Sequence, residues 1–288
     1  MSEIPAGMLQ KRRDLSRKFL FGNGAEVGAL HHPLPLGPLA RVRYVDRYDV
    51  DGLRRHYPEL RDYELVAVDV VDDGETLSTF RDGELDFLIA NHFLEHTENP
   101  IGTIRNHLRK IRPGGRLYFT VPNKHDSFDR HRRLTPFEHL VADDLDGPER
   151  SREDHYREWT RCVGKREEPS DIEEHSKALM AMNYSIHFHV WDARSFINFL
   201  DRTRAYLGNT FDVEHFSVNG AEIVAILKKR DASSPDVQSW LSRKKDGIFR
   251  FLSACRADWT GRLRASRTAL GRASNRPTRP ASQGAHSG

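Results

Sequence analysis

Histidines are the side chains of this sequence best suited to acid–base chemistry, and the chain contains 15 of them. Imidazole gains or loses a proton near neutral pH, so a histidine beside a reacting hydroxyl or amine can remove its proton. His187 and His189 lie two apart in SIHFHVW, which we predict to be a strand, and therefore share one face. His139, in TPFEHL, is a third candidate base. The alternatives are two buried histidines that order the chain, and a helix-surface position for His139.

A polar loop with two further histidines follows an apolar run. Leu85–Ala90 has the pattern of a strand that is covered on both faces, and Asn91–Pro100, which contains His92 and His96, would form the loop at its carboxyl end. A helix from Ile101 and a second buried strand, Leu117–Val121, complete a βαβ unit; Pro113-Gly114-Gly115 lies between them. Ligands bind beyond the carboxyl ends of such strands. We therefore place a site at Asn91–His96, although these histidines could instead brace the loop.

A metal site is a further reading of the same residues. His139, Asp143, Asp144 and the pair His187 and His189 could supply ligands. No spacing among them forms a recognised metal motif. No metal site is therefore predicted from the sequence.

The string NHFLEH followed by LRKIRPGGRLYFTVPN resembles the fourth- and fifth-strand region of class I S-adenosylmethionine-dependent methyltransferases. In that family the loop after the fourth strand faces the methionine part of the cofactor, and a PGG turn precedes the fifth strand. The resemblance implies S-adenosylmethionine as the cofactor.

Three upstream motifs resemble the other cofactor contacts of that family. Ala25–Ala29 reads AEVGA, an acidic residue two positions before a glycine, and glycine lets the backbone approach a ligand. Asp46 ends the predicted strand Val42–Val45, where the family's carboxylate accepts hydrogen bonds from the ribose. A third predicted strand, Leu65–Val71, precedes the aspartate pair near the adenine. The resemblance thus implies a cofactor site made of Glu26, Gly28, Ala29, Asp46, Asp72, Asp73, Asn91, His92 and His96.

The first crossover departs from the family pattern. Pro33, Pro35 and Pro38 follow Gly28, where the family usually has more glycines and a helix. Each proline lacks an amide and restricts the residue before it, so we expect an extended loop. The sequence also lacks the G-x-G-x-x-G of a nicotinamide enzyme at this turn.

The whole pattern predicts an α/β fold, with a Rossmann-like, seven-stranded, mostly parallel sheet and a carboxyl-terminal antiparallel hairpin. The hairpin signal is Asn219-Gly220, between two apolar runs, and Asp192 is a predicted N-cap for the helix before it. Residues 1–230 form the predicted methyltransferase domain. Residues 124–190 form a helical insert over the carboxyl edge of the sheet, which we expect to bind the acceptor.

Residues 231–288 form a predicted basic extension, partly helical and disordered at its end. From Arg243 onward only Asp246 and Asp258 are acidic. A basic amphipathic helix can contact an anionic membrane or a protein partner; the alternative is a helix packed on the domain. The remainder of the chain has no basic excess, which disfavours nucleic acid as a partner.

Composition favours a cytoplasmic protein. No apolar run approaches the roughly 20 residues of a membrane span, and the first residues lack the apolar core of a secretory signal. Cys162 and Cys255 are far apart and indicate neither a disulfide framework nor a zinc knuckle.

The predicted function is that of a bacterial methyltransferase of the glycan or secondary-metabolite type. It would act on a hydroxyl of a small molecule or a sugar, with O-methylation favoured. A non-catalytic methyltransferase-like binding module is one alternative. A nucleic-acid methyltransferase that uses the basic extension is the other.

Overall fold

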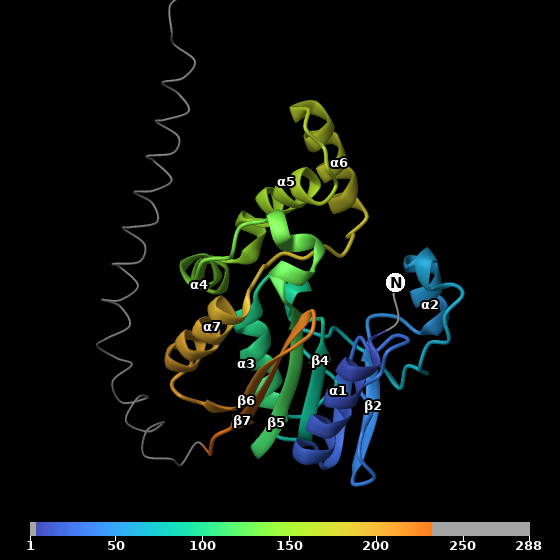
Figure 1. The fold of residues 1–288 in the computed structure, drawn as a ribbon, viewed down its shortest axis with the longest axis vertical. Helices are drawn as coiled ribbons and strands as arrows, with labels where there is room; N and C mark the ends of the chain where they lie inside the picture. The colour runs from blue at the N-terminus through green and yellow to red at the C-terminus, as the bar shows by residue number, and fades with distance from the viewer. Residues whose placement is uncertain (1–3, 232–288) are drawn as a thin grey trace, which may run out of the picture. The chain divides into compact units, whose positions relative to one another are not determined.

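The computed structural model describes residues 4–231, in which one seven-stranded sheet is the central element (Figure 1). Its strands, in chain order, are β1 (Gly22–Val27), β2 (Ala40–Asp46), β3 (Val70–Val71), β4 (Leu85–Asn91), β5 (Ile111–Pro122), β6 (Phe211–Asn219) and β7 (Glu222–Lys229). The spatial order is β3-β2-β1-β4-β5-β7-β6. Strands β1 to β5 are parallel, and β7 runs antiparallel between β5 and β6. The predicted fold class is confirmed.

Helices cover the two faces of the sheet. Alternate residues of β5 point to opposite faces, as the pleat requires. Tyr118 lies in the core cluster that α1 (Ala6–Phe19) contributes to through Leu15 and Phe19. Phe119 instead contacts Phe196 of α7 (Ala193–Tyr206), with ring centroids 5.7 Å apart. The helix α3 (Pro100–Lys110) joins β4 to β5 and ends before the PGG sequence, which lies within β5.

The connections from β1 to β2 and from β2 to β3 contain little regular secondary structure. Residues 28–39 contain no helix, as the prolines predicted. After β2, the helix α2 (Val50–His56) begins at Asp49, whose side chain accepts a hydrogen bond from the Gly52 amide at 2.7 Å. A short 3₁₀ helix, η1 (Pro58–Leu60), follows. The predicted third strand, Leu65–Val71, was too long, since only its last two residues pair with β2.

A helical insert, residues 124–190, separates β5 from α7, and we call it the cap. It contains η3 (Lys124–Asp126), η4 (Phe128–His131), α4 (Phe137–Asp146), η5 (Pro148–Arg150), α5 (Arg152–Cys162) and α6 (Pro169–Ala181). Tyr156, Leu179, Ile186 and Phe188 form a small core of its own. Figure 1 shows these helices gathered beyond one end of the sheet.

The return from the cap differs from the sequence prediction. Residues 185–191 were predicted to form a strand, but they pair with no strand. Their backbone instead binds loops: the Phe188 amide donates to the Glu95 carbonyl at 2.7 Å, and the Thr135 amide donates to the Val190 carbonyl at 3.1 Å. The segment therefore joins the cap to the loop after β4.

No helix among residues 4–231 has the length and apolar character needed to cross a membrane. The predicted basic helix of residues 239–271 lies outside the described residues.

Candidate active site

A cavity of about 560 Å³ lies at the carboxyl ends of the parallel strands. Successive crossovers and the cap contribute its walls. Its lining includes Gly28, Asp46, Asp72, Asp73, Glu75, His92, Phe93, His96, Thr97, Tyr184 and Ser185. The cavity therefore joins the predicted cofactor residues to two residues of the cap.

Gly28 forms the turn after β1 with a φ of +64°, a conformation that residues with a Cβ adopt only with strain. A Cβ built at Gly28 would meet no heavy atom nearer than Phe93 Cδ2, 4.0 Å away. The space in front of this turn is therefore open to a ligand, and the backbone borders it directly.

Asp46 and Asp73 lie at the strand ends that the sequence indicated. The Asp46 carboxylate accepts a hydrogen bond from the Arg47 amide at 2.8 Å, and its burial raises its pKa to about 6. Asp73 Oδ1 accepts from the amides of Glu75 and Thr76, at 2.8 and 3.2 Å. This contact orders the turn after β3.

Asp72 also lines the cavity, but its carboxylate braces the loop. It accepts hydrogen bonds from the Ser78 hydroxyl at 2.9 Å and from the Thr79 amide at 2.8 Å. Burial opposes ionisation here, yet these donors lower the pKa of Asp72 below its ordinary value. Both of its oxygens are thereby engaged within the protein.

Three of the predicted cofactor residues do not line the cavity. Glu26 is 1% exposed, and both of its oxygens accept from the Leu34 amide, at 3.0 and 3.1 Å. Burial raises the pKa of Glu26 to about 7. The Asn91 amide donates to Glu26 at 3.4 Å. Ala29 is likewise absent from the lining residues. Glu26 thus holds the proline-rich crossover in place.

His92 belongs to a network of charged groups beneath the cavity. Its Nε2 lies 3.2 Å from Glu222 Oε2 on β7, and its Nδ1 lies 3.4 Å from Glu95 Oε1. Arg12 of α1 also binds Glu222, with its Nε donating to Oε1 at 3.0 Å. Burial disfavours the charged imidazole, but the two carboxylates outweigh it and raise the pKa of His92 to about 9. The two carboxylates therefore favour the charged form of His92.

His96 and His187 lie together at the cap side of the cavity. Their ring centroids are 4.6 Å apart, and His96 lines the cavity while His187 lies behind it. His96 Nδ1 lies 2.9 Å from the Ile186 carbonyl, and burial lowers its pKa to about 4. His187 Nδ1 lies 2.6 Å from Asp129 Oδ2.

Asp129 is itself held by Arg132, whose Nη1 donates to its Oδ1 at 2.8 Å. Burial alone would raise the pKa of Asp129, but His187 and Arg132 lower it. In a neutral imidazole, donation from Nδ1 to the ionised carboxylate leaves the lone pair on Nε2. This is the usual arrangement of a histidine base oriented by a carboxylate.

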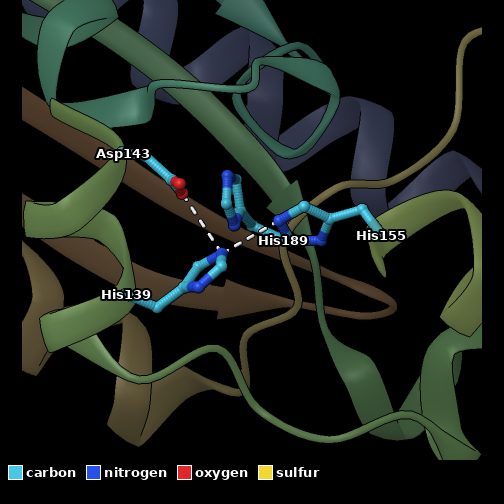
Figure 2. Close-up of side chains that lie close together, drawn as sticks. All are labelled: His139, Asp143, His155 and His189. Carbon is cyan, nitrogen blue, oxygen red and sulfur yellow. Dashed lines mark hydrogen bonds and ion pairs between the residues drawn. The ribbon is translucent and has the colours of Figure 1, made fainter. Parts of the chain in front are cut away.

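The other two predicted bases, His139 and His189, belong to a separate cluster and, like His187, do not line the cavity. Figure 2 shows them converging with Asp143 and His155. His139 Nε2 lies 2.9 Å from His155 Nε2 and 3.1 Å from Asp143 Oδ2. Burial lowers the pKa of all three histidines, that of His155 to about 3, and raises that of Asp143 to about 7.

The sequence analysis missed three residues of these sites, namely Glu75, Glu222 and His155. Glu75 is a half-buried carboxyl in the cavity wall, and partial burial raises its pKa to about 7. Its position two residues after Asp73 was the one signal in the sequence that could have indicated it. Glu222 and His155 gave no such signal, because each meets its partners only through the tertiary fold.

The methyltransferase domain family model matches residues 49–203, more than half of the chain. No match was found among curated proteins.

Solved structures with a similar fold include three methyltransferases. A SAM-dependent methyltransferase from Thermotoga maritima is 12% identical, with 77% of this chain and 92% of that chain covered and a TM-score of 0.41. A SAM-dependent methyltransferase from Aquifex aeolicus is 11% identical, with 78% of this chain and 98% of that chain covered and a TM-score of 0.36. The N-methyltransferase NodS from Bradyrhizobium japonicum is 13% identical, with 77% of this chain and 93% of that chain covered and a TM-score of 0.38. At these TM-scores the likeness says nothing about the acceptor.

The cavity fits S-adenosylmethionine on its own geometry. Gly28 leaves space where a Cβ would intrude, and Asp46 offers a half-buried carboxylate at the end of the neighbouring strand. Such a carboxylate can accept from two vicinal hydroxyls at once. Because the family model matches residues 49–203, more than half of the chain, the chain belongs to the methyltransferase domain family and is an S-adenosylmethionine-dependent methyltransferase.

Proposed function

We propose that the protein transfers the methyl group to a hydroxyl of a small molecule or sugar, with His187 as the general base. The observation that supports this most is the 2.6 Å contact between His187 Nδ1 and Asp129, beside the cap end of the cavity. A hydroxyl is a weak nucleophile until its proton is removed, so an oriented neutral imidazole suits this acceptor.

One end of the cavity would bind the cofactor and the other end would bind the acceptor. Gly28, Asp46 and Asp73 would hold the cofactor, which supplies a methyl group on a positively charged sulfur. Tyr184 and Ser185 of the cap would border the acceptor. Methyl transfer is an in-line displacement, so its rate depends chiefly on alignment and on the exclusion of water. His187 lies behind His96 and is not itself a lining residue, so the acceptor hydroxyl would have to reach past the His96 ring to it. His187 Nε2 would then take the hydroxyl proton, and Asp129 would stabilise the resulting imidazolium.

The test uses S-adenosylmethionine with a labelled methyl group and parallel panels of sugars, phenols, amines, RNA and DNA. We expect label in a base-stable ether of a hydroxyl acceptor. His187→Gln should then lower kcat by roughly 10²–10⁴-fold, the range for a general base, with the calorimetric Kd for the cofactor unchanged.

Asp129→Asn should lower kcat less and alter the pH–rate profile, because it changes the orientation of His187 rather than removing it. His175→Gln, in α6 and outside the cavity, is the matched control. Label in an amine or a nucleic acid would contradict the hydroxyl acceptor. Full activity of His187→Gln would contradict its role as the base, and His96→Gln would then be the variant to examine.

A cytoplasmic location is part of the proposal, and it is supported by the composition of two cysteines in 288 residues. Contact of residues 231–288 with a membrane surface or a protein partner is proposed from their basic composition alone.

A further inference from the structure

Four side chains from three parts of the cap converge away from the cavity. His139 and Asp143 lie one turn apart on α4, His155 comes from α5, and His189 comes from the extended return segment (Figure 2). One nitrogen or oxygen of each lies within 4.8 Å of the others. We call these residues the His139 cluster.

The spacing of the donor atoms suits a tetrahedral ion. His139 Nε2 is 2.9 Å from His155 Nε2 and 3.1 Å from Asp143 Oδ2. Donors bound at about 2.0–2.1 Å around zinc are separated by roughly 3.3 Å. A small closure or opening of these side chains would bring all four donors to bonding distance of one ion.

Hydrogen bonds among the four side chains do not provide a partner for every polar atom of the cluster. Asp143 is 3% exposed and His189 is 1% exposed, yet Asp143 Oδ2 and His189 Nδ1 are buried without a hydrogen-bond partner. His139 Nε2 carries at most one proton, which cannot serve both His155 and Asp143. Unpaired buried polar atoms cost free energy, so two of them facing one centre favour a cation-binding site there.

Neighbouring groups fix the orientation that a metal ligand needs. His189 Nε2 lies 3.3 Å from the Glu98 carbonyl, so it donates there and leaves Nδ1 unprotonated. The Ser151 hydroxyl donates to Asp143 Oδ1 at 2.7 Å, which leaves Oδ2 for the centre. Hydrogen bonds of this kind from outside the ligand set are the rule around protein-bound zinc.

We propose that His139, Asp143, His155 and His189 bind a divalent transition-metal ion, Zn²⁺ in the first place. Imidazole favours zinc and other late first-row metals over magnesium or calcium, which prefer oxygen ligands. Four protein donors make a closed, structural site. The ion would join α4, α5 and the return segment, and so hold the cap in shape.

The test starts from full-length protein without a histidine tag, prepared without chelator, and its metal is measured by mass spectrometry. We expect about one equivalent of Zn²⁺ per chain. After chelator treatment, Co²⁺ should give the visible absorption of a tetrahedral nitrogen and oxygen site. Zn²⁺ at roughly a hundred times its Kd should raise Tm by about 5–10 °C.

His155→Gln and Asp143→Asn should lose the bound metal, the cobalt spectrum and the shift in Tm. His175→Gln removes a partly exposed histidine outside the cluster and should keep all three. A metal-free wild-type protein that also shows no cobalt spectrum would overturn the proposal, as would equal binding by the cluster variants and the control. Neither result depends on the methyl acceptor.

Discussion

At the scale of single residues, Asp46 links cofactor binding to pH. Its carboxyl group is ionised only above a pKa of about 6, because burial penalises the charge. Ribose hydroxyls donate to the ionised form and would stabilise it. The affinity for S-adenosylmethionine should therefore fall as the pH drops through 6, by up to about tenfold per pH unit below it.

Calorimetry between pH 5 and pH 8 measures this dependence. Asp46→Asn keeps the shape of the side chain but cannot ionise, so it should bind weakly and without the change near pH 6. An affinity of the wild-type protein that stays constant over this range would show that Asp46 does not contact the ribose.

The site residues that the sequence indicated share a position, namely the end of a strand or the loop after it. Gly28 and Asp46 lie in the cavity wall because a parallel sheet brings all its carboxyl ends to one edge. The same positional rule predicted Glu26 as a cofactor residue, but its side chain binds the Leu34 amide instead. Alternation along a strand sends neighbours to opposite sides, and the sequence alone did not show which side held the ligand.

At the scale of elements, the first crossover replaces a helix with a loop that Glu26 fastens. The prolines made this change predictable, since they exclude a regular helix. The length of the third strand was not predictable, because only Val70 and Val71 find a partner in β2. The other residues of the predicted strand, Leu65–Asp69, belong to the loop that precedes β3. Composition alone does not distinguish apolar residues of a strand from apolar residues of such a loop.

The turn after β1 gives a prediction with an internal control. Gly28→Ala should cost about 1–2 kcal/mol of stability, since its φ of +64° is strained for alanine. It should also weaken cofactor binding, because the added methyl enters the cavity. Gly114→Ala has a φ of +77° and open space around its Cβ, so it should lose similar stability with no change in binding.

Urea unfolding and cofactor calorimetry on both variants separate strain from obstruction. Equal cofactor affinities in the two variants would show that the Gly28 turn does not approach the cofactor.

At the scale of the whole molecule, the sheet and the position of the cap were predictable, but the contacts within the cap were not. Strands of buried sheets leave apolar runs bounded by turn residues, and Asn219-Gly220 marks its hairpin by itself. The cap has a small core and charged helices, so α6 left no clear pattern. The contact of His139 with His155 and His189 joins three separate segments, and no local periodicity encodes such a meeting.

Tertiary contact also joins the two ends of the described chain, where Arg12 of α1 binds Glu222 of β7. Both side chains are almost fully buried, at 4% and 0% exposed. Removing one partner of a buried ion pair leaves an uncompensated charge, so Arg12→Met should destabilise the protein by about 3 kcal/mol. This loss lies at the lower end of the usual range because His92 also contacts Glu222. Adding Glu222→Gln to Arg12→Met should recover part of this loss of stability. Arg17 is exposed on the same helix, so the control Arg17→Met should change the stability by less than about 0.5 kcal/mol. Urea unfolding measures all three, and equal losses for Arg12→Met and Arg17→Met would mean that α1 is held by its apolar residues alone.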